Sequence, residues 1–122
     1  MIGYVTLGTR DLARAAEFYY AVAAELGTAR MMEGEKFIAW GTPRGGAGIG
    51  LTYPYDGEAA TVGNGVMVAL AAKYTAQVDR LHALALSLGG ACEGPPGDRG
   101  GFYAAYFRDR DGHKLNAFVM PG

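Results

Sequence analysis

The sequence predicts an α+β fold of two tandem βαβββ modules, and three observations lead to this prediction. The order strand, helix, strand, strand, strand can be read twice along the 122 residues. The two copies are offset by about 62 residues, so that Leu26-Gly27 at the end of the first expected helix corresponds to Leu88-Gly89 at the end of the second. The 20 glycines gather in short loops between the elements, which is typical of short strands joined by tight turns.

The first module is expected at about residues 1–53. It begins with a strand over residues 2–8 that is rich in β-branched and aromatic residues. Asp11 then precedes apolar residues at spacings of three and four, which predicts an amphipathic helix with an N-cap at Asp11 and an end at Gly27. Three short strands are expected next, over residues 28–32, 36–40 and 48–53.

A linker over about residues 54–64 and a second module over about residues 65–122 complete the chain. The second module begins with a strand over residues 65–71 and a helix over residues 75–88. Its remaining strands are expected over residues 91–93, 102–108 and 114–120. A sheet covered by one helix has one uncovered face, so neither module is expected to be stable alone. We expect a single domain in which the curved mixed sheet encloses a small-molecule cleft.

Composition argues against several classes of partner. The net charge is −1 and there is no run of Lys or Arg, so neither nucleic-acid binding nor attachment to an anionic membrane is expected. No apolar stretch approaches the length of a membrane span, and the N-terminus lacks a signal-peptide pattern. The single Cys92 excludes an internal disulfide and is expected to be a small buried hydrophobe. Together these features favour a cytoplasmic protein.

Four segments, spread in order over nearly the whole chain, carry a family resemblance. They are residues 4–12 with Phe18-Tyr19, residues 49–53, residues 94–97 and residues 109–115. Together they resemble the glyoxalase, bleomycin-resistance and extradiol-dioxygenase superfamily, also called vicinal oxygen chelate proteins. Residues 49–53 are similar to the fourth strand of its glyoxalase I branch. The resemblance implies the βαβββ fold and a cleft for a small molecule.

The resemblance also implies where a metal would be bound. Metal-binding members place a His, a Glu, a His and a Glu on the first, fourth, fifth and eighth strands. The matching positions here hold Tyr4, Gly50, Met67 and Asn116, with Val66 as the alternative on the fifth strand. A glycine, a thioether and a neutral amide are poor ligands for a hard divalent cation. We therefore expect no metal cofactor, and no isomerisation of the methylglyoxal–glutathione hemithioacetal, which in this family uses a metal and a carboxylate.

Other side chains do not rebuild such a site. His82 lies at the edge of the second helix's apolar stripe and is expected to be solvated or partly covered. His113 follows a turn and is expected at the surface. Calcium binding by His113 with Asp109 and Asp111 is not expected, because no downstream Glu takes the bidentate position of an EF-hand loop. We assign no catalytic residue.

Strand alternation predicts which side chains line the cleft. The expected ligand-binding residues are Tyr4, Thr6, Gly50, Thr52, Met67, Asn116 and Phe118. This lining is mostly apolar and suits a flat, partly aromatic molecule that Tyr4 and Asn116 would orient. Arg44 and Arg99 lie in Gly/Pro-rich loops from which a guanidinium could reach an anionic ligand, although such arginines are more often solubilising loop charges.

Three functions are compatible with these observations. The first is a metal-free protein that binds a small molecule, with a homodimer as the expected assembly, whether the cleft forms within one chain or across exchanged modules. The second is a metal-dependent enzyme with non-standard ligands, either a lactoylglutathione lyase-like lyase or an extradiol-type dioxygenase. The third is a structural module whose cleft is filled by its own side chains.

Overall fold

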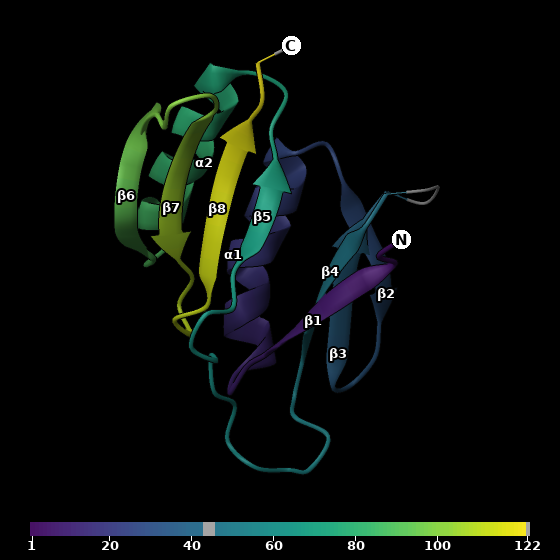
Figure 1. Ribbon diagram of the computed structural model, residues 1–122. Helices are drawn as coiled ribbons and strands as arrows, with labels where there is room; N and C mark the ends of the chain where they lie inside the picture. The colour runs from purple at the N-terminus through teal and green to yellow at the C-terminus, as the bar shows by residue number, and fades with distance from the viewer. Residues whose placement is uncertain (43–45, 122) are drawn as a thin grey trace. The chain divides into compact units, whose positions relative to one another are not determined.

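The computed structural model describes residues 1–42 and 46–121 and confirms the α+β fold. Within these residues the chain forms two helices and eight strands, in two four-stranded mixed sheets (Figure 1). The chain divides into two compact units, residues 1–62 and residues 63–122, and each unit holds one sheet and one helix. In each unit the order of elements is βαβββ, as the internal repeat predicts.

In unit 1 the sheet order is β1-β4-β3-β2, with β1 parallel to β4 and the other neighbours antiparallel. Every predicted element is present, with bounds shifted by one or two residues. The elements are β1 (Tyr4–Gly8), α1 (Leu12–Glu25), β2 (Ala29–Glu33), β3 (Phe37–Gly41) and β4 (Gly48–Thr52).

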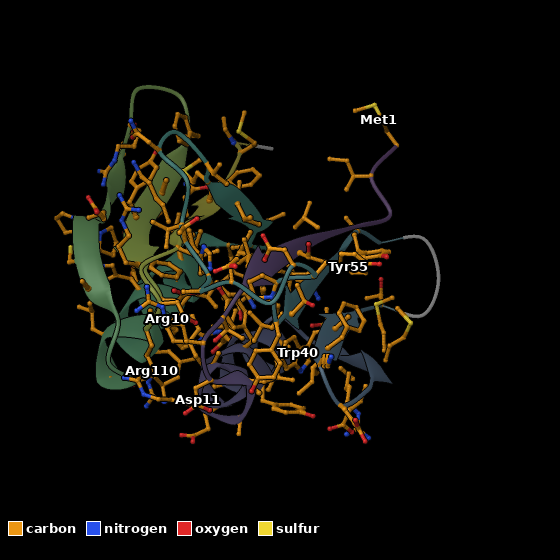
Figure 2. All side chains as sticks on the ribbon, turned by 90° about the horizontal axis from the view of Figure 1, so that it is seen from below. Met1, Arg10, Asp11, Trp40, Tyr55 and Arg110 are labelled. Carbon is orange, nitrogen blue, oxygen red and sulfur yellow. The ribbon has the colours of Figure 1, made fainter. Side chains whose placement is uncertain are left out.

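Helix α1 begins and ends where the sequence predicts. Asp11 is the N-cap, and its side chain accepts a hydrogen bond from the Arg14 backbone N–H at 3.1 Å. Gly27 follows the helix with φ +74°, a conformation that glycine adopts without strain. The apolar face of α1 packs on the sheet around Trp40, whose ring centroid lies 5.8 Å from that of Tyr19 and 5.0 Å from that of Tyr20 (Figure 2).

Unit 2 repeats this topology, with the sheet order β5-β8-β7-β6 and β5 parallel to β8. Its core contains apolar side chains with 0% exposure from the helix and from two strands, among them Leu81, Phe107 and Leu115. The elements are β5 (Val68–Ala71), α2 (Thr75–Ser87), β6 (Ala91–Asp98), β7 (Tyr103–Arg108) and β8 (Lys114–Val119).

Two strands of unit 2 differ from the predicted bounds. Strand β5 begins at Val68 rather than residue 65, so Val66 and Met67 precede it. Strand β6 continues to Asp98 rather than ending at residue 93, although it contains Pro95 and Pro96. It lies at the edge of the sheet and its pairing with β7 shifts register twice, which is where a strand tolerates proline.

The strand pairings match between the two units. Val5 pairs with Ile49 in unit 1, and Val68 pairs with Leu115 in unit 2. Met67 is therefore the counterpart of Tyr4, and Asn116 is the counterpart of Gly50. In each sheet alternate residues face the unit's own helix, and the others form what we call the open face. Among the described residues, no helix is long and apolar enough to cross a membrane.

Candidate functional site

The expected ligand-binding residues lie on the open faces of the two sheets. On sheet 1, Leu7 and Leu51 are buried on the helix face, so Tyr4, Thr6, Gly50 and Thr52 point the opposite way. Tyr4 and Thr6 are exposed and Thr52 is half-buried.

A phenylalanine that the sequence analysis missed occupies the space beside Gly50. A Cβ atom added at Gly50 would lie 2.8 Å from Cε2 of Phe37, closer than real Cβ contacts allow. The Phe37 ring also meets Tyr4 in an edge arrangement, with centroids 6.3 Å apart. Since Phe37 is two residues before Ala39, the strand partner of Gly50, alternation places both on the same face. That alternation was the available signal for Phe37.

A methionine occupies the neighbouring glycine positions on the same face. A Cβ atom at Gly41 would lie 2.5 Å from Sδ of Met31, and one at Gly48 would lie 3.1 Å from the same sulfur. Glycines on β3 and β4 thus make room for side chains of the sheet itself. Tyr4, Phe37 and Met31 lie over this glycine-rich centre, and Tyr4 and Met31 are still 53% and 39% exposed.

The open face of sheet 2 has a different character, because its centre is an amide. Asn116 is paired with Ala69 on one side and with Tyr106 on the other, and the residue is only 3% exposed. Its side chain makes no hydrogen bond to any part of the chain that the structure describes. The amide atoms are not among the fully buried polar atoms without a partner, so they keep some solvent contact and can still donate and accept hydrogen bonds. Phe118 lies half-buried two residues further along β8, and Met67 is 42% exposed.

Two cations lie over the Tyr106 ring beside Asn116. The Arg99 guanidinium carbon is 5.6 Å from the ring centroid, and the Lys114 ammonium is 5.5 Å from it. Arg99 folds back over glycines of β6, since a Cβ atom at Gly97 would lie 2.9 Å from its Nη1. The guanidinium also donates a hydrogen bond to the carbonyl of Pro95. Sequence analysis named Arg99 as a residue that could reach a ligand but did not assign Tyr106 or Lys114 to the site. Arg44 lies outside the described residues.

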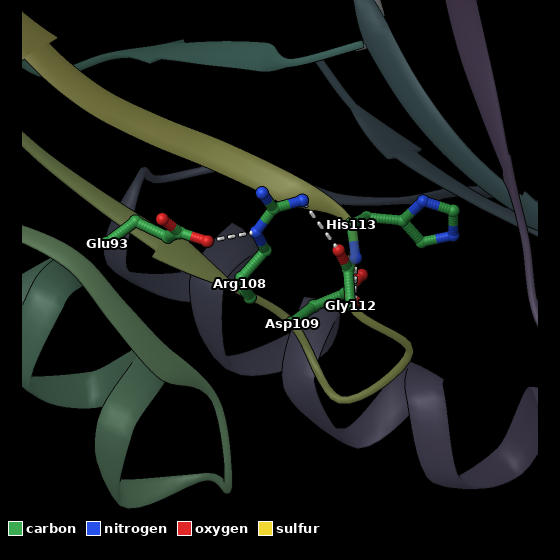
Figure 3. A network of polar contacts seen from close by, with 5 residues as sticks. All are labelled: Glu93, Arg108, Asp109, Gly112 and His113. Atoms are coloured by element: carbon green, nitrogen blue, oxygen red, sulfur yellow. Dashed lines mark hydrogen bonds and ion pairs between the residues drawn. The ribbon is translucent and has the colours of Figure 1, made fainter. Parts of the chain in front are cut away.

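A third cation on this face is already neutralised. Arg108 Nε lies 2.5 Å from Glu93 Oε1, and its Nη1 donates to the carbonyl of Gly112 at 3.0 Å (Figure 3). The hydrogen bond and the charge of Arg108, with a smaller contribution from Lys114, lower the pKa of Glu93. Arg99 and Lys114 have no carboxylate within ion-pair distance among the residues that the structure describes.

Comparison with known proteins identifies the family. Residues 1–117 match the family model of the Glyoxalase/Bleomycin resistance protein/Dioxygenase superfamily. The chain belongs to this superfamily. It is similar to a glyoxalase/bleomycin resistance protein from Albidiferax ferrireducens T118, with 36% identity, a TM-score of 0.92 and 99% of each chain covered.

Other solved structures of the superfamily fold are more distant. A hypothetical protein SA1046 from S. aureus is 27% identical, with a TM-score of 0.75 over 95% of this chain and 91% of that one. A lactoylglutathione lyase from Agrobacterium tumefaciens is 19% identical, with a TM-score of 0.68 over 98% of this chain and 92% of that one. At that identity the likeness concerns the fold alone. No protein in the curated set of sequences matches the chain.

The residues at the superfamily's metal positions do not fit a metal. Gly50 offers no donor atom, and the Phe37 ring fills the space that a longer side chain there would need. Tyr4 packs against the same ring, and Asn116 and Met67 offer a neutral amide and a thioether. Within residues 1–42 and 46–121, no group of three or more His, Cys, Asp or Glu side chains could hold a metal.

Three predictions about single side chains are wrong or need adjustment. His113 is buried at 4% exposure rather than at the surface, and its backbone N–H donates to Asp109 Oδ1 at 2.9 Å within the turn (Figure 3). Cys92 is exposed rather than buried, since it lies on the edge strand β6. His82 is more buried than expected, at 9% exposure, with its Nε2 3.2 Å from Cys92 Sγ.

Two hollows lie away from the expected ligand-binding residues. A cavity of about 510 Å³ opens at the N-terminal end of α2, where Tyr74, Phe102, Tyr103 and Met120 contribute to its lining. The hydroxyl of Tyr103 donates to Asp79 Oδ1 at 2.6 Å, and this hydrogen bond raises the pKa of Tyr103. A smaller cavity of about 280 Å³ lies between Thr9, Tyr53 and residues 57–60.

Proposed function

We propose that this superfamily member is a metal-free protein that binds a small, partly aromatic molecule through its open sheet faces. The observation that carries the proposal is Asn116, a nearly buried amide without a side-chain hydrogen bond among the described residues. Because the Asn116 amide atoms keep some contact with solvent, a ligand can reach this amide and form the hydrogen bonds that the described residues do not supply. Tyr106 and Phe118 supply aromatic surface on the same face.

The absence of a metal in this function is supported by the packing of unit 1. Any carboxylate placed at position 50 would have to displace Phe37, and the present glycine instead accepts that ring. The superfamily's metal-dependent chemistry uses two carboxylates, and this chain has a glycine and an asparagine at those two positions, Gly50 and Asn116. A lyase or dioxygenase with ligands from other positions is the alternative function.

Elemental analysis tests this part of the proposal. Protein purified without a histidine tag is expected to hold far less than one Zn²⁺, Ni²⁺, Fe²⁺ or Mn²⁺ per chain, before and after incubation with each metal. It is also expected to show no isomerisation of the methylglyoxal–glutathione hemithioacetal. About one bound metal per chain, or turnover that a chelator abolishes, would favour the enzyme.

Ligand binding is tested by a thermal-shift screen of small aromatic compounds, followed by calorimetry on each hit. Asn116→Leu is expected to weaken a polar hit by about 1–3 kcal/mol, because the ligand's polar group would be buried without a partner. The matched control is Asn64→Leu, which changes an exposed loop amide and is expected to leave affinity unchanged. A hit that is insensitive to changes at both Tyr4 and Asn116 would contradict the proposed site, and a screen without hits would favour the filled structural module.

We also propose that the protein is a cytoplasmic homodimer. Strand β2 supports the dimer, because it forms one edge of sheet 1 and all five of its residues are exposed. Uncovered edge strands commonly pair with another chain or are shielded by one. Light scattering is expected to give twice the chain mass of 12.8 kDa, and a monomer at all concentrations would overturn this part.

A further inference from the structure

We infer that the ligand bound on the open face of unit 2 is an anion, specifically a small aromatic carboxylate. This inference rests on the proposed function and adds the chemical class of the ligand. It starts from the three cations of that face, Arg99, Arg108 and Lys114. Among the residues that the structure describes, Arg108 alone of these three forms an ion pair with a carboxylate, and it lies 2.5 Å from Glu93.

The two remaining cations converge on one aromatic ring. Arg99 and Lys114 lie 5.6 and 5.5 Å from the centroid of Tyr106. Like charges that share one ring repel each other, and the ring's quadrupole offsets only part of this repulsion. The charge of Glu93 attracts Lys114 only weakly, because the ion pair of this carboxylate is with Arg108. A bound anion would balance both charges.

The neighbouring amide extends this positive region into a binding surface. Asn116 is the strand partner of Tyr106, so its NH₂ group lies on the same face as the two cations. A guanidinium, an ammonium and an amide can all donate to one carboxylate, and the guanidinium fork matches carboxylate geometry. Tyr106 and Phe118 offer aromatic contact next to these donors. This combination fits a planar acid better than a bare inorganic anion.

The reach of Arg99 is set by the chain's own glycines. Gly94 and Gly97 have no side chains that would occupy the space above β6. The Arg99 guanidinium takes this space and lies 3.3 and 2.9 Å from where their Cβ atoms would be. Its hydrogen bond to the Pro95 carbonyl holds it there and leaves other N–H groups available. The cation is therefore positioned before any ligand binds, which reduces the ordering that binding requires.

The experiment is a ¹H–¹⁵N titration of the full chain with three probes: benzoate, its neutral isostere benzamide, and inorganic phosphate. Benzoate is expected to bind about tenfold or more tightly than benzamide, because charge-assisted hydrogen bonds are roughly twice as strong as neutral ones. The benzoate-induced shifts should include Tyr106, Lys114 and the Asn116 side chain, and should weaken as salt is raised.

Variants locate the effect. Arg99→Gln and Lys114→Gln are each expected to weaken benzoate about fivefold to tenfold while leaving benzamide unchanged. The matched controls are Arg80→Gln and Lys73→Gln. Arg80 also lies over a tyrosine ring, 5.4 Å from the centroid of Tyr74, but on α2, which covers the other face of the sheet. Both controls are expected to bind benzoate as the unchanged chain does.

Equal affinity for benzoate and benzamide, no benzoate binding, or equal losses in the variants and the controls would overturn the inference. Phosphate binding as tight as benzoate binding would overturn its aromatic part. The proposed function fails separately, if the thermal-shift screen yields no ligand that depends on Asn116. Neutral hits that depend on Asn116 but are insensitive to Lys114→Gln would keep the proposed function and remove the anion.

Discussion

The open faces of the two sheets differ in chemistry although their strand pairings are the same. Gly50 and Asn116 occupy equivalent positions, yet a Cβ atom at Gly50 would meet Phe37 at 2.8 Å while Asn116 carries a buried polar side chain. Sheet 1 covers its glycine-rich centre with its own apolar side chains, and sheet 2 surrounds an amide with cations. In a repeated module, the same position can thus be structural in one copy and available to a ligand in the other.

The two helices differ in a parallel way. Helix α1 has a capping aspartate, and the backbone N–H of Leu12 also donates to the Tyr53 hydroxyl at 3.1 Å. Helix α2 has Tyr74 at its N-cap, and the Tyr74 side chain makes no capping hydrogen bond to the helix backbone. Local determinants therefore specify α1 more strongly than α2, and tertiary packing must contribute more to α2.

The largest expected effects concern the cores, and they test whether the two units unfold together. Phe18 in unit 1 and Phe107 in unit 2 are both 0% exposed, so replacing either by alanine should lower the free energy of unfolding by about 3–5 kcal/mol. Because a one-sided sheet is not expected to be stable alone, both variants should unfold in a single transition.

The single tryptophan makes this measurement specific. Trp40 lies in unit 1, so its fluorescence reports that unit, while far-UV circular dichroism reports the whole chain. In urea, the two signals are expected to shift together for both Phe18→Ala and Phe107→Ala. A Phe107→Ala variant that loses dichroism while its fluorescence transition stays in place would show that the units unfold independently.

The next effect concerns the open face of sheet 1. Gly50→Ala should destabilise the protein by about 1–3 kcal/mol, because the added methyl group overlaps the Phe37 ring. In a Phe37→Ala background the same substitution should be nearly neutral, giving a coupling between the two sites in a double-mutant cycle.

Gly48→Ala is the control for this cycle. Its added Cβ would lie 2.9 Å from the backbone oxygen of Trp40, so removing the Phe37 ring should not relieve it. Urea unfolding of the single and double variants measures the coupling. If Gly50→Ala lowers the free energy of unfolding equally with and without the Phe37 ring, the ring is not the reason that position 50 requires glycine.

Much of the fold follows from the sequence because its signals are local. The apolar spacing of α1, its Asp11 cap and Gly27 each specify one feature, and the internal repeat then supplies the topology. The extension of β6 through two prolines was not predictable, because it depends on the strand's place at the sheet edge.

The candidate site was predictable in part, for a related reason. Alternation along a strand indicates which residues share a face, and this places Tyr4 and Asn116 correctly on open faces. The same alternation puts Phe37 and Lys114 on these faces, but it does not indicate how far their long side chains extend over the neighbouring positions, and both were missed. The position of Arg99 depends on a loop conformation, which no periodic pattern encodes.

A smaller effect would sharpen the comparison of the helices. Asp11→Ala should lower the free energy of unfolding by about 1 kcal/mol, because the Arg14 N–H would lose its partner. Tyr74→Asp should raise it by several tenths of a kcal/mol, since the extended backbone there, with φ −159° and ψ 164°, suits a capping side chain. Urea unfolding at neutral pH measures both. Destabilisation by Tyr74→Asp would show that its hydroxyl, which accepts a hydrogen bond from Arg80, matters more than the missing cap.

The smallest expected effect is a pH dependence of stability that arises from His82 in unit 2, the unit that contains both histidines. Burial lowers the pKa of His82 below its usual value of 6.5, and the charge of Asp79 opposes this only in part. The unfolded chain therefore binds this proton more readily than the folded chain. It follows that the contribution of His82 to stability is complete above about pH 6.5 and is lost as the pH falls through the window between 6.5 and the lower folded pKa.

Urea unfolding at pH 7.5 and 5.5 should show a smaller loss of stability for His82→Gln than for the unchanged chain. His113→Gln serves as the comparison, because it alters the other buried histidine of the same unit. An identical loss in His82→Gln and in the unchanged chain would show that this imidazole does not titrate differently on folding.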